Sequence, residues 1–238
     1  MIKRVIAAAL VAATALCFAA CGGKSSSENS VIEIVKPKTA ATEDEGNITA
    51  KLDAVENSPN VNGKRFNINL RNFTFDYNKE KEGLGESNKL VLANWNKKND
   101  AKDNNGVDIQ YWYYDDKEVS FTATVETESQ KILNIGCGTT MNQFTAEKDN
   151  GVQNSDIILA KAALMAKVVC GFPEGSESIL QDIFYRTATE SDDSLWYRGY
   201  VFTLSTEENK DDSDNDIMQF RVFPITDDLK KEWKLEEY

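Results

Sequence analysis

The chain has no histidine among its 238 residues, and this absence limits the chemistry open to its other side chains. Without an imidazole, neither a Ser-His-Asp nor a Cys-His nucleophile can be assembled from this chain alone. Zinc and copper sites that depend on imidazole ligands are excluded for the same reason. Any catalysis would therefore use carboxylates, Lys, Tyr, Ser or Cys.

One acidic cluster has neighbours that suit sugar chemistry. Asp115, Asp116 and Glu118 stand beside Trp112 and Tyr114. A pair of carboxylates next to an aromatic platform is the arrangement of glycoside hydrolases, so a carboxylate-dependent glycan hydrolase is our alternative prediction. Nothing in the sequence brings two of these carboxylates to a defined separation, and adjacent acids in a turn are usually solvated. The main prediction therefore assigns no catalytic residue.

A second acidic run invites comparison with calcium-binding loops. Asp212, Asp214 and Asp216 have the spacing of the first three ligands of such a loop. Ile217 stands where the loop needs glycine, and Phe223 where it needs a bidentate glutamate. We predict a solvated loop here, with no metal site and no cofactor.

The aromatic residues are the best candidates for a ligand surface. An antiparallel sheet with one wet face exposes some of its aromatics, and exposed aromatics flanked by acids suit a protein, peptide or glycan partner. The alternative is that cross-strand aromatic pairs only stabilise the sheet. The candidates are Tyr111, Trp112, Tyr113, Tyr114, Trp196 and Tyr200.

The charge of the chain excludes one class of partner. There are 27 Lys plus Arg against 39 Asp plus Glu, a net charge of −12. Removing residues 1–20, which hold Lys3 and Arg4 and no acid, makes the charge −14. So negative a protein repels nucleic acid and anionic lipid head groups. We therefore predict no nucleic-acid partner.

The N-terminus has the parts of an export signal. A short basic segment precedes an apolar run over residues 5–20 that is too short for a comfortable membrane span. The run ends Phe18-Ala19-Ala20-Cys21-Gly22, which resembles the lipobox of bacterial lipoproteins, where small residues precede a cysteine that receives diacylglycerol. The family usually has Leu at the position of Phe18. An ordinary secretory signal cut after Ala20 is the alternative.

The resemblance implies a location. Residues 1–20 would be a lipoprotein signal peptide, and Cys21 would carry acyl chains such as palmitate. Two chains anchor a protein stably, whereas one does so only marginally. The protein would then be held at the cell membrane or the outer membrane, facing outside the cytoplasm. Its contact with the membrane would be the lipid on Cys21.

Two further cysteines are left after Cys21. Cys137 is predicted to end a strand, and Cys170 to end a buried helix. An exported compartment permits a disulfide between them, and two buried thiols are the alternative. A catalytic thiol is not expected, because an apolar helix would raise the pKa of Cys170.

Composition divides the chain into three parts. After the predicted signal, residues 21–65 are predicted to be the lipidated cysteine and a flexible tether. Residues 22–30 are rich in Gly and Ser, and Pro37 and the acids of residues 39–46 favour more linker, although residues 31–35 could form a short strand. Residues 66–238 have a normal length for a single domain with one hydrophobic core.

Hydrophobic periodicity predicts the elements of that domain. Alternation with period two predicts strands, and a nearly continuous apolar run closed by Gly171 and Pro173 predicts a buried helix. Predicted strands are 66–77 with a bulge, 89–95, 107–114, 118–126, 131–137, 195–206 and 217–223, with polar turns or loops at 99–106 and 138–153. Predicted helices are 157–170, 178–187 and 227–235.

The order of these elements predicts an α+β fold. We expect an antiparallel meander sheet with helices packed on one face. Similar Thr-rich strands at 119–124 and 201–205 suggest a weak ββα pseudo-repeat. For function we expect a membrane-tethered extracytoplasmic lipoprotein, a non-enzymatic binding or envelope-assembly module with the glycan hydrolase as the alternative.

Overall fold

The computed structural model describes residues 61–62, 65–84, 88–115, 119–146, 153–189, 194–207 and 216–238. The predicted signal peptide, Cys21 and most of the predicted tether lie outside these residues. None of the helices in the described part is long and apolar enough to cross a membrane.

Eight strands form one sheet, in the order β10-β7-β8-β9-β6-β5-β4-β3. Every neighbouring pair is antiparallel except β10 and β7. The strands are β3 (Asn96–Lys102), β4 (Asp108–Asp115), β5 (Ser120–Glu126), β6 (Ile132–Thr140), β7 (Ser194–Tyr197), β8 (Tyr200–Glu207), β9 (Ile217–Pro224) and β10 (Glu236–Glu237). A two-stranded hairpin, β1 (Val61–Asn62) and β2 (Arg65–Phe66), precedes them.

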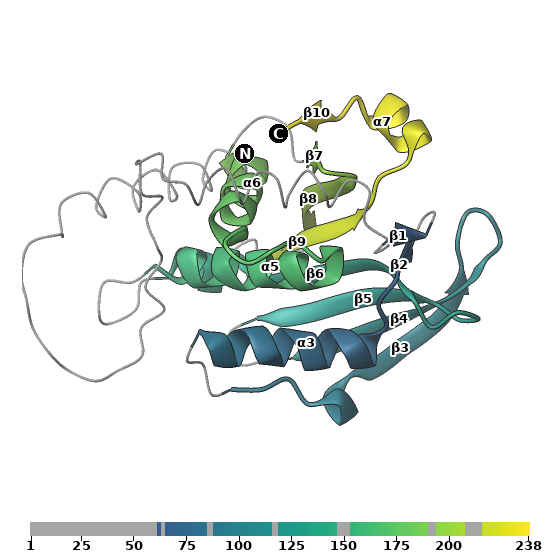
Figure 1. Ribbon diagram of the computed structural model, residues 1–238, viewed down its shortest axis with the longest axis horizontal. Helices are drawn as coiled ribbons and strands as arrows, with labels where there is room; N and C mark the ends of the chain where they lie inside the picture. Colours follow the sequence, from purple (N-terminus) through teal and green to yellow (C-terminus); the bar gives the residue numbers. More distant parts are fainter. Residues whose placement is uncertain are drawn as a thin grey trace, which may run out of the picture.

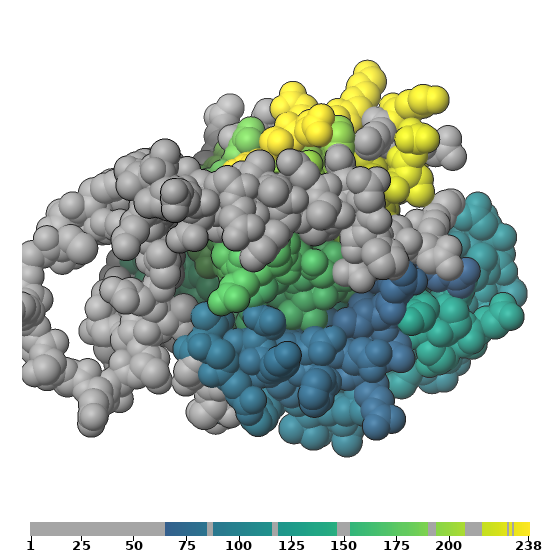
Figure 2. Space-filling view, viewed as in Figure 1, coloured from purple at the N-terminus to yellow at the C-terminus, as the bar shows by residue number. Residues whose placement is uncertain are grey.

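Most of the helices cover one face of this sheet (Figure 1). The helices are α3 (Leu70–Gly83), α4 (Met141–Thr145), α5 (Asn154–Cys170), α6 (Glu177–Thr189) and α7 (Asp227–Trp233), with a 3-10 turn η1 at Leu92–Asn94. Seen from the helical side, α3 in blue and the green helices form a large part of the surface (Figure 2). The α+β class, with helices packed against a mostly antiparallel sheet, is confirmed.

Two groups of aromatic rings fill the core at its two sides. Phe121 of β5 contacts Phe73 and Tyr77 of α3, with ring centroids 6.4 and 5.4 Å apart. Phe184 of α6 contacts Phe202 and Phe220, at 5.4 and 5.5 Å. The middle helix, α5, instead buries alanines such as Ala162, Ala163 and Ala166, all fully buried. Small side chains let a helix lie close to the sheet, so α5 fits between the aromatic groups.

The predicted strand over residues 66–77 is wrong, because these residues enter helix α3. Asn69 caps the helix by accepting a hydrogen bond from the Asn72 amide at 2.9 Å. Phe73 and Tyr77 are one helical turn apart and fully buried, whereas Phe75 is 70% exposed. In a strand, all three rings would lie on one face. The spacing of Phe73 and Tyr77 is compatible with both the strand period of two and the helical period of 3.6, and the Asn69 cap favours the helix.

The predicted strand over residues 89–95 is also wrong. This segment contains η1, and the strand β3 follows it in a segment that was predicted to be largely turn. β3 is an edge strand with mostly exposed polar side chains, among them Lys97, Lys98 and Lys102. Lysines at a sheet edge discourage pairing with other chains. The sequence of this segment carries no hydrophobic signal for a strand. It is a strand because it pairs with β4.

A turn divides the strand predicted over residues 195–206. Arg198 and Gly199 have φ angles of 49° and 84°, and they join β7 and β8 as a hairpin. Two consecutive residues with positive φ are typical of tight hairpin turns. Trp196 and Tyr200 were predicted on one face, and the hairpin places them on opposite faces instead.

The loop predicted over residues 138–153 is partly wrong, since β6 continues to Thr140 and α4 follows directly. The predictions for β4, β5, β9 and α6 hold to within a few residues. So do those for α5, which ends at left-handed Gly171, and for α7, capped by Thr226.

The pseudo-repeat is not confirmed. After β6, α5 packs on the core face, but after β9 Trp233 of α7 contacts Phe223 on the other face.

Cys137 and Cys170 are buried thiols rather than halves of a disulfide. Both lie in the hydrophobic core, fully shielded from solvent. Burial raises the pKa of the Cys170 thiol well above its ordinary value, which suppresses the reactive thiolate. Of the two alternatives that the sequence left open, the structure therefore has the buried thiols.

Lys167 of α5 joins three helices. Its ammonium group lies 2.7 Å from Glu80 of α3 and 2.5 Å from Glu177 of α6, and its side chain is only 7% exposed. Burial lowers the pKa of Lys167, but the hydrogen bonds and charges of Glu177 and Glu80 outweigh it, so the pKa ends above its ordinary value. The cluster thus holds a buried charge by pairing it on both sides.

We expect Lys167→Met to lower the free energy of unfolding by about 1–3 kcal/mol at pH 7, measured by urea denaturation, because two neighbouring carboxylates lose their shared cation. A raised folded-state pKa gives stability that is complete below the unfolded-state pKa of about 10.4. That stability is lost as the pH rises through the folded-state pKa, so the difference from wild type should shrink there.

The matched control carries Lys167→Met together with Glu80→Gln and Glu177→Gln. It should recover part of the loss, because the repelling charges are gone. If the single variant were as stable as wild type at pH 7, the cluster would not contribute to folding.

Candidate functional site

The face of the sheet opposite the core is mostly polar. Strand alternation sends Phe121, Ala123 and Val125 of β5 into the core, and Ser120, Thr122 and Thr124 to the other side. We call this second side the open face. Helix α7 contacts the open face at β9, where the rings of Trp233 and Phe223 have centroids 5.9 Å apart.

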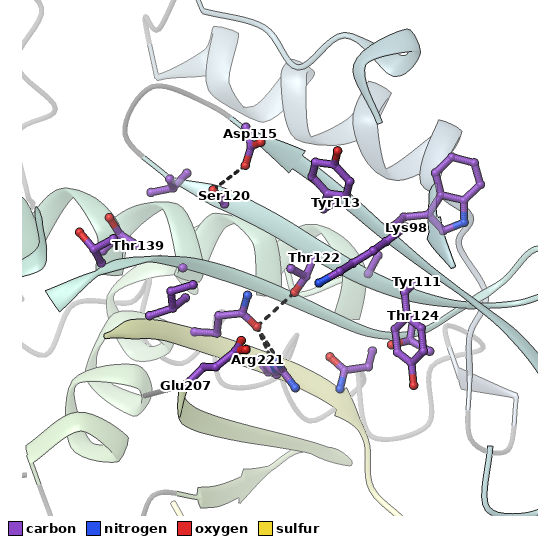
Figure 3. Close-up of a pocket in the computed structure, with 18 of the residues that line it drawn as sticks. Lys98, Tyr111, Tyr113, Asp115, Ser120, Thr122, Thr124, Thr139, Glu207 and Arg221 are labelled. Atoms are coloured by element: carbon purple, nitrogen blue, oxygen red, sulfur yellow. Dashed lines mark hydrogen bonds between the residues drawn. The ribbon is translucent and has the colours of Figure 1, made fainter. Parts of the chain in front are cut away.

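A hollow of about 920 Å³ lies on the open face. We call it the sheet trough. Strands β3, β4, β5, β6 and β9 line it, together with Glu207 of β8 and Gln143 of α4. Figure 3 shows side chains from several neighbouring strands around it. A volume of this size is that of a small-ligand site.

Two glycines of β6 lie at the trough: Gly138 lines it, and Gly136 is opposite its lining residue Arg221. Gly136 is opposite Arg221, and Gly138 is opposite Gln219, both on β9. A Cβ atom on Gly136 would lie 3.0 Å from Cγ of Arg221 and 3.1 Å from Oγ1 of Thr122. A Cβ atom on Gly138 would overlap the carbonyl oxygen of Met218. Glycine in a strand interior marks a close approach of this kind, and here it also leaves the middle of the sheet hollow.

Arg221 is the cation at the centre of this region. Its Nε and Nη2 both donate hydrogen bonds to Oε1 of Gln219, at 3.0 and 2.5 Å. Oγ1 of Thr122 also reaches that oxygen, at 3.4 Å. Because the carboxamide oxygen is occupied, the NH₂ group of Gln219 is left to donate to a ligand. The three side chains form one network across β5 and β9.

Burial lowers the pKa of Arg221, while the negative charges of Glu207 and of an ionised Tyr111 would raise it. A guanidinium stays protonated under these conditions, so the physical meaning is a positive charge with poor hydration. Such a charge is stabilised by an anion that replaces the lost water.

Tyr111 and Tyr113 of β4 form one wall of the trough. They are 39% and 36% exposed, and both project from the open face, opposite Thr124 and Thr122 of β5. Two residues apart on a strand, the rings share one face and offer adjacent apolar surfaces. The trough therefore combines an aromatic wall with hydrogen-bonding groups.

Two carboxylates also reach the trough. Asp115 lies at the end of β4, where it accepts a hydrogen bond from Ser120 Oγ at 2.9 Å. Glu207 lies at the end of β8, next to Arg221 (Figure 3). Asp116 and Glu118, which completed the predicted acidic cluster, lie outside the described residues. So do Asp212 and Asp214, and the described part holds no group of three side chains suited to a metal ion.

Of the six residues predicted to form a ligand surface, the structure brings three together in the lining of the trough: Tyr111, Trp112 and Tyr113. Tyr114 was predicted there but is 6% exposed in the core, against Trp95 at 5.5 Å. Tyr200 is 2% exposed, and its hydroxyl donates to the Cys170 carbonyl at 2.9 Å.

The two tryptophans of the predicted surface are half-buried. Trp112 lines the trough and also packs against the core cluster, and its Nε1 donates to Gln110 at 3.3 Å. Trp196 stands opposite Val201, away from the residues that line the trough. Strand alternation sends Tyr114 into the core, because the even residues of β4 face the opposite side of the sheet from Tyr111 and Tyr113.

Sequence reasoning missed Arg221, Gln219, Lys98 and the two glycines. A signal existed for three of them. Gln219 and Arg221 occupy the polar positions of an otherwise buried strand, and Gly136 interrupts a strand that was already predicted. Their proximity to Tyr111 could not be predicted, since it requires the order of five strands.

Comparison of the chain with protein-family models, curated proteins and solved structures finds no match. Fold and site alone therefore define the class. This is an α+β protein with most of its helices on one face of its sheet and a ligand-sized trough on the other.

The two glycines should respond differently to a methyl group. We expect Gly138→Ala to lower the free energy of unfolding by about 3 kcal/mol, because Cβ would meet the backbone of β9. Gly136→Ala should cost less than about 1 kcal/mol, since the Arg221 side chain can shift and alanine is the better strand residue. Urea denaturation of the two variants measures the contrast. Equal costs would contradict the close β6–β9 approach.

Proposed function

We propose that this protein is a membrane-tethered extracytoplasmic lipoprotein, a non-enzymatic module whose sheet trough binds a glycan. The observation that carries the binding part is the trough itself, with Tyr111 and Tyr113 facing Thr122, Gln219 and Arg221 across the open face. The lipoprotein part is supported by the sequence alone, through the lipobox that ends at Cys21.

A glycan suits the chemistry of the trough. Sugar rings present apolar C–H faces and many hydroxyls, so they pair with an aromatic wall and with amide, hydroxyl and carboxylate groups. The lining of the trough supplies Tyr111 and Tyr113 for the first, and Asn134, Gln219 and Asp115 among others for the second. An apolar ligand would require a lining rich in aliphatic side chains, and few of the side chains in the trough are aliphatic.

An extended peptide suits the trough less well. Peptides that bind sheets usually add a strand at an edge, where backbone groups are unpaired. The trough lies across strands whose backbones are already paired on both sides, from β4 to β9. Recognition there depends on side chains, and this favours the glycan over the peptide.

The tether is tested by Cys21→Ala. The native chain should fractionate with membranes and incorporate labelled palmitate, whereas the variant should lose the label and appear in the soluble exported fraction. Cys137→Ala is the control, because that thiol is buried in the core and should not affect the label. A Cys21→Ala protein that is still firmly membrane-bound would contradict the proposed anchor.

Binding is tested with a broad glycan array and with Tyr111→Ala and Tyr113→Ala. We expect wild type to bind at least one glycan and each variant to lose about tenfold in affinity, because a sugar face loses its aromatic partner. The control is Phe75→Ala, which removes a ring that is 70% exposed on the opposite side of the molecule. Absence of binding to every glycan, or equal losses in the control, would contradict the proposal.

The same array decides on the hydrolase alternative. If the bound glycan were cleaved, new reducing ends would accumulate, and Asp115→Asn would abolish them. A stable complex without new reducing ends is the expected result.

A further inference from the structure

We propose that the trough selects glycans that carry a carboxylate, and that Arg221 and Lys98 receive this group. The inference rests on the proposed glycan-binding function and specifies its substrate class. It arises from the two cations of the trough, which come from opposite sides of the site, β9 and β3.

Among the described residues, the side chain that accepts hydrogen bonds from Arg221 is that of Gln219, which is neutral. Two of its five N–H groups donate to the carboxamide oxygen of Gln219. Glu207 acts on it through charge, without a hydrogen bond. The remaining N–H groups of a half-buried guanidinium form a planar fork, which matches the two oxygens of a carboxylate.

Lys98 reaches the trough from an irregularity in β3. The pairing of β3 with β4 shifts register between Lys97 and Asn99, and the shift releases Lys98 from regular alternation. Its side chain extends across the sheet toward Thr122 (Figure 3). Lys97, its neighbour, instead forms an ion pair with Asp100 at 2.9 Å and does not line the trough.

The charge count favours a monoanion. Lys98 and Arg221 are balanced by Asp115 and Glu207, so the trough as built is neutral. A carboxylate leaves one excess negative charge, whereas a phosphate monoester would leave about two. The chain as a whole is at −12, which disfavours highly charged ligands further. A sugar with one carboxyl per ring is the class that fits.

The experiment uses the mature lipidated protein in detergent and an array that holds uronic-acid, sialylated, sulfated and neutral oligosaccharides. Any carboxylated glycan that binds is tested again after its carboxyl group has been reduced to an alcohol. Affinities are then measured for Arg221→Gln and Lys98→Gln. Arg71→Gln on the exposed side of α3 and Lys97→Gln are controls that remove the same charges outside the trough.

We expect binding to carboxylated glycans, a loss of about ten- to a hundredfold on reduction of the carboxyl group, and a similar loss with Arg221→Gln. Lys98→Gln should lose less, about threefold, because an exposed ammonium contributes less than a paired fork. The controls should bind as wild type does. Lys98 lies on an exposed edge strand, so this variant tests the site even if Arg221→Gln folds poorly.

Other outcomes overturn the inference in distinct ways. Binding to neutral glycans with no dependence on Arg221 or Lys98 would refute the carboxylate and leave the proposed function standing. Binding confined to sulfated glycans would refute the choice of a carboxylate. Absence of binding to any glycan would refute the proposed function, and the inference with it.

Discussion

The pairing of β6 with β9 is the constraint on which the rest of the structure depends. It joins the meander β3–β6 to the unit β7–β9, although the two strands are separated in the chain by α4, α5 and α6. Gly138 permits this pairing, because any side chain there would overlap the backbone of β9. The resulting register places Gly136 opposite Arg221, so the same pairing that completes the core also shapes the trough.

The two faces of the sheet have different physical roles. On the core face, aromatic rings and the alanines of α5 exclude water, and Lys167 is tolerated only because Glu80 and Glu177 pair with it. On the open face, Arg221 is only half-buried and is held by a neutral carboxamide. Arg221 therefore differs from Lys167 in that its hydrogen-bond partner is neutral and Glu207 acts on it through charge alone.

Prediction from sequence succeeded where local pattern and tertiary environment agree. Strands β4, β5 and β9 alternate strongly, and α5 is apolar on all sides with Gly171 at its end. It failed where one pattern fits two structures. Phe73 and Tyr77 suit both a strand and a helix, and the polar β3 becomes a strand only through its partner. Turns with positive φ at a non-glycine residue, such as Arg198, carry little sequence signal.

By itself, the sequence determined the absence of imidazole chemistry, the acidic charge and the α+β class, since these follow from composition and local periodicity. It also predicts an export signal. Only the tertiary structure decided which aromatics face outward, that Cys137 and Cys170 are thiols, and that Arg221 lies in a trough lined by Tyr111. Each of these depends on strand order and register, which join residues about a hundred positions apart. Periodicity within a single strand cannot encode such contacts, because it specifies a face of the sheet and not the neighbour across it.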